Sequence, residues 1–446
     1  MSYIPTTDEQ QQKMLADIGV NSIDELFADI PESVKLKTGL NIPKAMSELE
    51  LTAHMQEMAG KNINLDKYTC FLGAGAYDHF IPSVVTNLLS RQEFYTAYTP
   101  YQPEISQGTL QAIFEYQTMI CSLTGMDVSN ASLYDGATAL AEAASMVCEA
   151  TRRNEIIAIR SIHPESREVM STYAKFKGMT LIECGIQDGV TDLQNLKELL
   201  NDNTAAVLVQ SPNFFGAIEN IKEIAEIAHE NKSLLVVSCD PVSLAILKAP
   251  GDIGADIVVG EGQVLGNPVS FGGPYLGFMA AKKEFTRRMP GRIVGETVDR
   301  DGKRGYVLTL QTREQHIRRE KATSNICSNQ ALNALAATIY LSVMGKNGLK
   351  KAAELCLQKA HYAYRKLIET NLFSPAFESP FFKEFLLIYH GDADKLNKHL
   401  LEKNIIGGFA TERFYPEFKG GYLVAVTEKR TRDEIDRLVS EVVSAC

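Results

Sequence analysis

The sequence lacks the closely spaced ligands that a disulfide framework or a zinc site requires. No CxxC pair and no HExxH motif occurs in its 446 residues, and its eight histidines are dispersed. Its cysteines are scattered in the same way, at positions 70, 121, 148, 184, 239, 327, 356 and 446. Scattered cysteines in a chain this large are typical of buried, reduced thiols in a cytoplasmic protein. We therefore expect a cytoplasmic protein with neither structural disulfides nor a metal site.

Basic runs and long apolar runs are also missing. Asp and Glu number 55 against 45 Lys and Arg, which gives a net charge of -10. No Lys/Arg cluster is long enough to bind a polyanion, so nucleic acid is not an expected partner. The longest largely apolar stretch, residues 331–344, is interrupted by Asn333 and Thr338 and is too short to span a bilayer. Residues 1–12 are largely polar, so we expect neither a secretory signal nor a membrane-bound protein.

The first sixty residues predict a helical arm. They contain three capping boxes, each with a hydroxyl at a helix start and Glu or Gln three residues later. The boxes are Thr7 with Gln10, Ser22 with Glu25, and Ser47 with Glu50. An arm with only a few helices can bury little apolar surface by itself. We therefore expect residues 1–60 to wrap the main body or a neighbouring subunit.

The rest of the chain predicts a large α/β domain, residues 61–330, and a smaller α+β domain, residues 331–446. Apolar runs alternate with helical patterns in the large domain, which indicates a mostly parallel sheet covered by helices on both faces. Its predicted strands are 156–159, 181–184, 206–209, 234–239 and 256–259, its predicted helices include 110–124 and 135–151, and residues 287–323 are expected to be rich in loops. The small domain is expected to contain a helix from about residue 330, helices at 350–370, 392–404 and 431–444, and strands at 385–389 and 422–426.

An aromatic segment, residues 95–108, is the first candidate for a functional loop. It reads YTAYTPYQPEISQG, and its candidate site residues are Tyr95, Tyr98, Tyr101, Gln102 and Glu104. Tyrosines combine an apolar body with a hydroxyl, and loops often carry functional groups, so the segment fits the wall of a substrate pocket. It equally fits a packed turn whose tyrosines cover the edge of a core. The composition leaves both interpretations open.

A glycine-rich loop after a buried strand is the second candidate. Residues 255–278 read ADIVVGEGQVLGNPVSFGGPYLGF, and the preceding strand ends on Asp240. Pyridoxal phosphate (PLP) enzymes of the aminotransferase type use this layout: the acid keeps the pyridine nitrogen protonated, and a lysine in the loop forms the imine. Ligands of parallel sheets bind beyond the carboxyl ends of the strands, where both features fall. This loop, however, contains no lysine.

A helix start at Asp135, Gly136 and Thr138 is the third candidate. Glycine and a hydroxyl at a helix N-terminus suit a phosphate, because free N–H groups and the helix dipole point at it. Asp135 adds negative charge at the same point, so a tightly packed helix start without phosphate is an equal alternative.

Five longer stretches carry a resemblance to a known family. They are residues 71–79 (FLGAGAYDH), 94–108, 134–139, 255–278 and 318–330. The chain resembles, essentially from end to end, the P-protein family of the glycine cleavage system, glycine dehydrogenase (decarboxylating). It is most similar to the first of the two subunits into which many bacteria split that protein. The resemblance implies the fold of the fold-type-I PLP-dependent transferases.

The resemblance also places a glutamine where the PLP lysine would stand. Aligning Pro268 and the Gly-Gly-Pro turn after it on the second subunit's loop puts Gln263 on the imine-forming lysine. Asp240 then falls on the acid that pairs with the pyridinium. A carboxamide offers no nucleophilic nitrogen, so this chain is predicted not to hold PLP covalently. Four other lysines lack a glycine-rich strand-end loop behind them: Lys248, Lys282, Lys283 and Lys321.

The implied reaction is shared by two subunits. The second subunit holds PLP, decarboxylates glycine with the pyridine ring as electron sink, and delivers the aminomethyl group to the lipoyl arm of a carrier, the H protein. An α2β2 assembly is expected. In this chain, the candidates of the aromatic segment are expected to line the shared pocket, and Thr323, Ser324 and Asn325 to approach the partner's phosphate. The vestige of this chain's own PLP site would comprise Asp135, Gly136, Thr138, Asp240 and Gln263.

Two alternatives remain open from the sequence. The chain could be a structural or regulatory pseudoenzyme that supports the PLP-bearing subunit without contributing to its pocket. It could also be a stand-alone PLP lyase that uses an unexpected lysine. The second alternative predicts a protein that absorbs near ~420 nm when PLP is bound as an imine.

Overall fold

The computed structural model describes residues 5–326 and 328–445, and it divides into two compact units, residues 1–63 and residues 64–446. The first unit contains α1 (Asp8–Ile18), a 3-10 helix (Ile23–Phe27) and α2 (Glu48–Ala59). Both α-helices begin with the predicted capping boxes, at Thr7 and at Ser47. The box predicted at Ser22 is wrong: its side chain makes no cap hydrogen bond, and the carboxylate of Glu25 accepts from the N–H of Asn21 at 3.0 Å.

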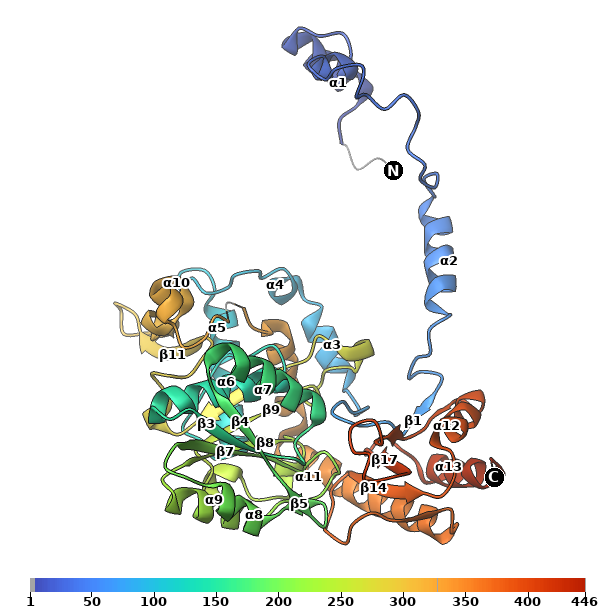
Figure 1. Ribbon diagram of the computed structural model, residues 1–446. Coiled ribbons are helices and arrows are strands. Elements are labelled where there is room, and N and C mark those ends of the chain that lie inside the picture. Colours follow the sequence, from blue (N-terminus) through green and yellow to red (C-terminus); the bar gives the residue numbers. More distant parts are fainter. Residues whose placement is uncertain (1–4, 327, 446) are drawn as a thin grey trace. The chain divides into compact units, whose positions relative to one another are not determined.

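A seven-stranded sheet forms the centre of the second unit (Figure 1). Its strands, in spatial order, are β2 (Val128–Ser129), β10 (Gly277–Ala281), β9 (Ile257–Glu261), β8 (Leu234–Cys239), β7 (Thr204–Ser211), β3 (Glu155–Ile159) and β4 (Thr180–Cys184). The strands from β9 to β4 are parallel, and β10 runs antiparallel to both of its neighbours. The five strands predicted in this region are confirmed, because strands buried on both faces read as continuous apolar runs.

Helices cover both faces of this sheet, and successive strand residues enter different cores. Ile157 and Val237 pack in one core with α9 (Ile221–Glu230) and α5 (Gln107–Thr124). Their neighbours Ile156 and Val236 pack in the other core. That second core includes α6 (Gly136–Thr151) and α7 (Pro164–Lys177), which lie over the opposite face from α8 (Leu193–Leu199) and α9 (Figure 1). The side-chain period of two in a strand produces this division.

A hairpin corrects the prediction that residues 287–323 are mainly loop. Strands β11 (Ile293–Val298) and β12 (Arg304–Thr309) pair antiparallel there. Val294 and Tyr306 pack with Leu110 of α5, and the two charged strand residues, Glu296 and Arg304, lie farther along the same face, toward the turn. The charged turn between the strands, residues 299–303 (DRDGK), and the glycine in each strand hid the strand pattern.

The C-terminal part is built on a four-stranded antiparallel sheet, in the order β13 (Phe373–Pro375), β14 (Glu384–Tyr389), β17 (Gly421–Ala425) and β16 (Phe409–Ala410). Helices α12 (Ala393–Glu402) and α13 (Arg432–Ser444) pack on it. Helix α11 (Ala331–Glu369) contributes to two cores: Cys356 belongs to a core of the central sheet, and Ala360 to the core of this smaller sheet. The boundary at residue 330 stays a prediction.

Short elements complete the described chain. They are β1 (Thr69–Cys70) paired with β15 (Ile405–Ile406), β5 (Ile186–Gln187) paired with β6 (Val190–Thr191), α3 (Ser83–Leu89), α4 (Gln92–Tyr95) and α10 (Gln315–Arg318). Among residues 5–326 and 328–445, no helix combines the length and the apolar character needed to cross a membrane.

Candidate functional site

A cavity of about 300 Å³ lies at the carboxyl ends of β8 and β9, where parallel sheets bind ligands. Asp240 follows β8, Glu261 ends β9, and Asp135 and Gly136 begin α6 at its wall. The C-terminal part supplies Lys383 and Glu384, and residues 74–77 form another part of the wall. We call this cavity the cleft.

The acid predicted to face a pyridine nitrogen already has a cationic partner. Lys383 is 2% exposed, and its Nζ lies 2.5 Å from a carboxylate oxygen of Asp240. The same ammonium donates to Nε2 of His79 at 2.9 Å and lies 3.8 Å from the centroid of the Tyr77 ring. A buried ammonium requires compensation of this kind. Asp240 is therefore the counter-ion of Lys383.

The next residue, Glu384, fastens the motif at residues 73–78 to the C-terminal sheet. Its carboxylate accepts from the N–H of Ala74 at 2.6 Å and from the hydroxyl of Tyr77 at 2.7 Å. Burial raises the pKa of Glu384 to about 7. A Cβ on Gly73 would lie 2.1 Å from the same carboxylate, so glycine is required there. This glycine motif shapes the cleft by close packing.

The N-terminus of α6, the predicted phosphate position, is occupied by carboxylates. Asp135 caps the helix by accepting from the N–H of Thr138 at 2.7 Å. Glu261 accepts from the N–H of Gly136 at 2.9 Å and, through its other oxygen, from those of Leu276 and Gln263. Burial, with a smaller contribution from Asp135, raises the pKa of Glu261 to about 7. A phosphate would meet two acids and an N–H that is already bonded.

Gln263 is a buried tie between two segments of backbone. It is 1% exposed, and its carbonyl accepts from the N–H of Tyr77 at 3.0 Å. Its amide donates to the carbonyl of Asn267 at 2.7 Å and to that of Tyr77 at 3.2 Å. The side chain thus satisfies both backbone groups of Tyr77. Taken together, the residues of the cleft do not fit PLP, because the groups that would hold its phosphate and its ring are bonded to one another.

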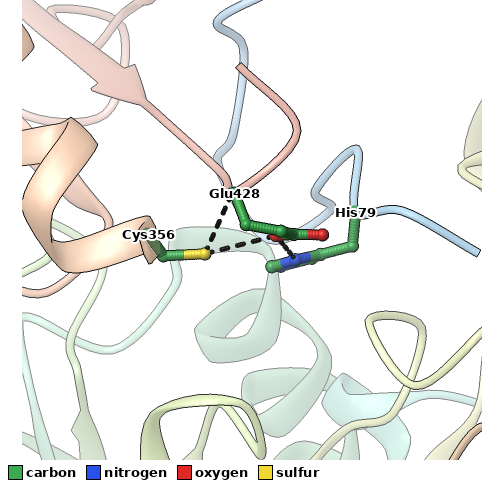
Figure 2. Close-up of side chains that lie close together, drawn as sticks. All are labelled: His79, Cys356 and Glu428. Carbon is green, nitrogen blue, oxygen red and sulfur yellow. Dashed lines mark hydrogen bonds and ion pairs between the residues drawn. The ribbon is translucent and has the colours of Figure 1, made fainter. Parts of the chain in front are cut away.

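A second polar cluster lies beside the cleft (Figure 2). His79, Cys356 and Glu428 place potential metal-ligating atoms within 4.8 Å of one another. The ammonium of Lys383 can only donate, so Nε2 of His79 accepts from it and Nδ1 carries the ring proton. That proton points to Glu428 at 2.6 Å and leaves no lone pair on Nδ1 for a metal. Burial raises the pKa of the Cys356 thiol well above its usual value. The cluster is therefore hydrogen-bonded rather than arranged as a metal centre.

The aromatic segment contains two environments. The hydroxyl of Tyr101 donates to Asn329 at 2.7 Å, and the guanidinium of Arg292 lies 4.0 Å from its ring centroid. Tyr95 at the end of α4 is 71% exposed, and Tyr98 is 94% exposed with no hydrogen-bond partner among the described residues. Gln102 and Glu104 are exposed as well. The packed-turn interpretation thus fits Tyr101, and the substrate-pocket interpretation stays a prediction for Tyr95 and Tyr98.

The segment at Thr323, Ser324 and Asn325 lies near residues that the aromatic segment contacts. Thr323 accepts through its carbonyl from Lys177 at 3.1 Å, and Ser324 accepts from the N–H of Ile326 at 3.1 Å. Thr323 and Ser324 line a small hollow with two arginines, Arg288 and Arg313. Asn329, four residues after Asn325, receives the bond from Tyr101. The predicted site residues therefore form two groups: Asp135, Gly136, Thr138, Asp240 and Gln263 around the cleft, and the others outside it.

The sequence did not predict the residues that close the cleft. Lys383 directly precedes the buried strand β14 and Glu384 begins it, and a Lys-Glu pair at the start of such a strand was the available signal. Glu261 stands two residues before Gln263, at the end of β9. Of the lysines considered from the sequence, Lys282 instead pairs with Asp256 at 2.5 Å.

Comparisons with known structures define the class first. The chain matches a sphingosine-1-phosphate lyase from Burkholderia pseudomallei with a TM-score of 0.67, at 14% identity, over 93% of this chain and 94% of that one. It matches a NifS-like protein with a TM-score of 0.62, at 13% identity, over 84% and 98%. These two likenesses show the fold, which is that of the fold-type-I PLP-dependent transferases, as the sequence predicted.

Closer relatives define the family. The family model described as glycine cleavage system P-protein matches residues 1–442. Proteins named probable glycine dehydrogenase (decarboxylating) subunit 1 are 57% identical in Carboxydothermus hydrogenoformans, over 98% of both chains, and 58% identical in Moorella thermoacetica, over 99% and 98%. A crystal structure of an inhibitor-bound glycine decarboxylase (P-protein) aligns with a TM-score of 0.90 at 40% identity over both full chains. The chain belongs to the P-protein family of the glycine cleavage system, and the predicted likeness to its first subunit is confirmed.

Proposed function

We propose that this chain is the subunit of a two-subunit glycine dehydrogenase (decarboxylating) that does not hold the cofactor. The second subunit carries PLP, which acts as the electron sink for loss of the glycine carboxyl group, and the aminomethyl group passes to the lipoyl arm of the H protein. The observation that supports this proposal is made in the cleft. There the carboxylate of Glu261 accepts from the start of α6, and the ammonium of Lys383 pairs with Asp240, so both charged positions are already occupied. In addition, the resemblance puts Gln263 at the position of the imine-forming lysine. This chain then contributes to chemistry at a pocket completed with its partner, in an α2β2 assembly.

Tyr98 is the strongest candidate for that shared pocket. Its ring is 94% exposed, so a partner surface can cover it, and its hydroxyl is available to a substrate. Tyr95, Gln102 and Glu104 are exposed on the same segment and are further candidates. Tyr101 has a different proposed role: its bonds to Asn329 and Arg292 hold the segment in place.

The hollow beside Thr323 and Ser324 supports a role near an anion. Nε and Nη2 of Arg313 are buried there without a partner among the described residues, and burial lowers the pKa of this guanidinium. Unpaired guanidinium donors are suited to phosphate oxygens. We infer that Thr323, Ser324 and Asn325 approach the phosphate of the partner's PLP.

The first unit supports an association with another subunit. Apolar side chains along it are strongly exposed, among them Leu49 at 82%, Val34 at 71% and Leu40 at 70%. Exposed apolar surface of this extent indicates a protein contact. We propose that the second subunit covers it.

The test is reconstitution with the second subunit and a lipoylated H protein. Release of labelled CO₂ from carboxyl-labelled glycine should fall by about 10²-fold or more with Tyr98→Phe if its hydroxyl transfers a proton, and by a similar factor with Glu104→Ala. Size-exclusion chromatography should show an unchanged complex. Tyr362→Phe, which removes a hydroxyl bonded to Asp436 on α11 and α13, is the matched control.

The alternative function is structural or regulatory support. The self-bonded cleft is compatible with it, because a subunit without a ligand of its own can act as a scaffold. Silent Tyr98→Phe and Glu104→Ala variants in an intact complex would favour that alternative over ours. Borohydride trapping followed by peptide mapping tests the stand-alone lyase: a pyridoxyl group on any lysine of this chain would support it.

A further inference from the structure

The two charged ends of the cleft have a common arrangement. At one end, a helix N-terminus suited to an anion receives the carboxylate of Glu261, whose two oxygens accept from three backbone N–H groups. At the other end, an acid suited to a cationic ring nitrogen receives the ammonium of Lys383. Each end holds a side chain with the charge of the cofactor group that would otherwise bind there.

We propose that Glu261 and Lys383 are internal replacements for the two charged ends of PLP. Glu261 takes the position of the phosphate at α6, and Lys383 takes that of the pyridinium at Asp240. The chain therefore reaches its folded cleft without cofactor, and exchange of Gln263 for lysine alone would not restore a PLP site. This inference rests on the proposed function, because both take this chain to hold no cofactor of its own. The binding experiments below test the cleft, and the Tyr98→Phe variant tests the subunit interface, so a failure of one can be told from a failure of the other.

The replacements are part of the framework that joins the two sheets of the second unit. Lys383 and Glu384 stand at the start of β14, while Asp240 follows β8 of the central sheet. The ammonium also bonds His79, which bonds Glu428 from the segment after β17. PLP would have to displace Lys383 from Asp240 and Glu261 from α6 at the same time. The loss of a loop lysine, by contrast, would leave both of these positions open.

The first experiment treats full-length chains with PLP and then with borohydride, and maps the labelled peptides. The unchanged chain and Gln263→Lys should both remain unlabelled. The triple variant Glu261→Gly/Gln263→Lys/Lys383→Met should gain a pyridoxyl group at the introduced lysine, at least about tenfold above Gln263→Lys. Equal labelling of Gln263→Lys and the triple variant would show that only the lysine was missing and would overturn the proposal. A folded triple variant that remains unlabelled would overturn it as well.

The second experiment removes Glu261 and Lys383 in separate variants. It tests the proposal even if the triple variant fails to fold. Glu261→Gly should bind inorganic phosphate at least about tenfold more tightly than the unchanged chain, because three N–H groups lose their acceptor. Lys383→Met should bind pyridoxine, which lacks the phosphate, at least about tenfold more tightly than the unchanged chain does. Calorimetry measures both affinities.

Matched controls separate internal replacement from net charge. Glu165→Gln removes another carboxylate that lines the cleft and that, among the described residues, makes no hydrogen bond to the start of α6, so it should not gain phosphate binding. Lys383→Arg keeps the positive charge and should not gain pyridoxine binding. Phosphate binding by Glu165→Gln equal to that of Glu261→Gly, or by the unchanged chain, would overturn the replacement at α6. Pyridoxine binding by Lys383→Arg equal to that of Lys383→Met would overturn the replacement at Asp240.

Discussion

The cleft and the aromatic segment differ in how their polar groups are satisfied. In the cleft, Lys383, Glu261 and Gln263 are buried or nearly so, and each has partners in this chain. In the aromatic segment, Tyr98 is exposed and has no described partner. Buried polar groups must be bonded for the fold to be stable, whereas exposed ones can be kept for another molecule. The comparison locates stability in the cleft and interaction in the segment.

The strongest test of this comparison is Lys383→Met, because it leaves the carboxylate of Asp240, 14% exposed, without its partner. Removing one member of a buried ion pair costs about 3–5 kcal/mol of unfolding free energy. Urea denaturation of the full chain measures the loss. Lys429→Met, whose ammonium pairs with Asp78 and is 36% exposed, is the control and should cost under about 1 kcal/mol. Equal losses in the two variants would contradict a special role of the cleft.

A second comparison uses two glutamines. Gln263→Ala leaves the N–H of Tyr77 and the carbonyl of Asn267 without their bonds, whereas the carbonyl of Tyr77 keeps its bond from the N–H of His79, so we expect a loss of about 2–4 kcal/mol. Gln102→Ala, in the aromatic segment, removes an exposed amide and should change stability by no more than about 0.5 kcal/mol. The same denaturation measurement checks both. A stable Gln263→Ala variant would mean that residues 73–78 are held by other contacts.

The sequence predicted the sheet well and the cleft only in part. Strands such as β8 were found because a strand that is buried on both faces consists of consecutive apolar residues. Asp240 was found because it directly follows such a strand. The pairing of Asp240 with Lys383 could not be predicted, because it depends on how the smaller sheet docks against the central sheet. The hairpin at β11 and β12 escaped prediction because its strands each contain a glycine and the turn between them is charged.

Acid titration gives a third test of the cleft. Burial raises the pKa of Glu384 from 4.5 to about 7, so the folded state binds its proton more tightly than the unfolded state. The resulting destabilisation is complete above about pH 7 and disappears below about pH 4.5, so stability should rise as the pH falls between these values. Glu384→Gln, which resembles the protonated form, should flatten this rise by roughly 3 kcal/mol.

The difference between the variant and the unchanged chain isolates Glu384 from other groups. Burial lowers the pKa of His163, which acts in the opposite direction, but it does so in both proteins. Bonds from His79 and Phe80, against the effect of burial, lower the pKa of Glu428 to about 2, so its contribution is lost only in more acidic solution. Parallel pH curves for the two proteins would mean that Glu384 titrates normally.

The smallest expected change in stability concerns the aromatic segment. Tyr98→Phe removes a hydroxyl that no described residue bonds, from a ring that is 94% exposed. Its effect on the unfolding free energy of the isolated chain should lie within about 0.5 kcal/mol. Tyr101→Phe should cost about 1 kcal/mol, because it breaks the bond to Asn329. If Tyr98→Phe destabilises the chain as much as Tyr101→Phe does, Tyr98 belongs to the fold. If it is neutral for stability and still reduces glycine decarboxylation in the complex, its hydroxyl acts on something outside this chain.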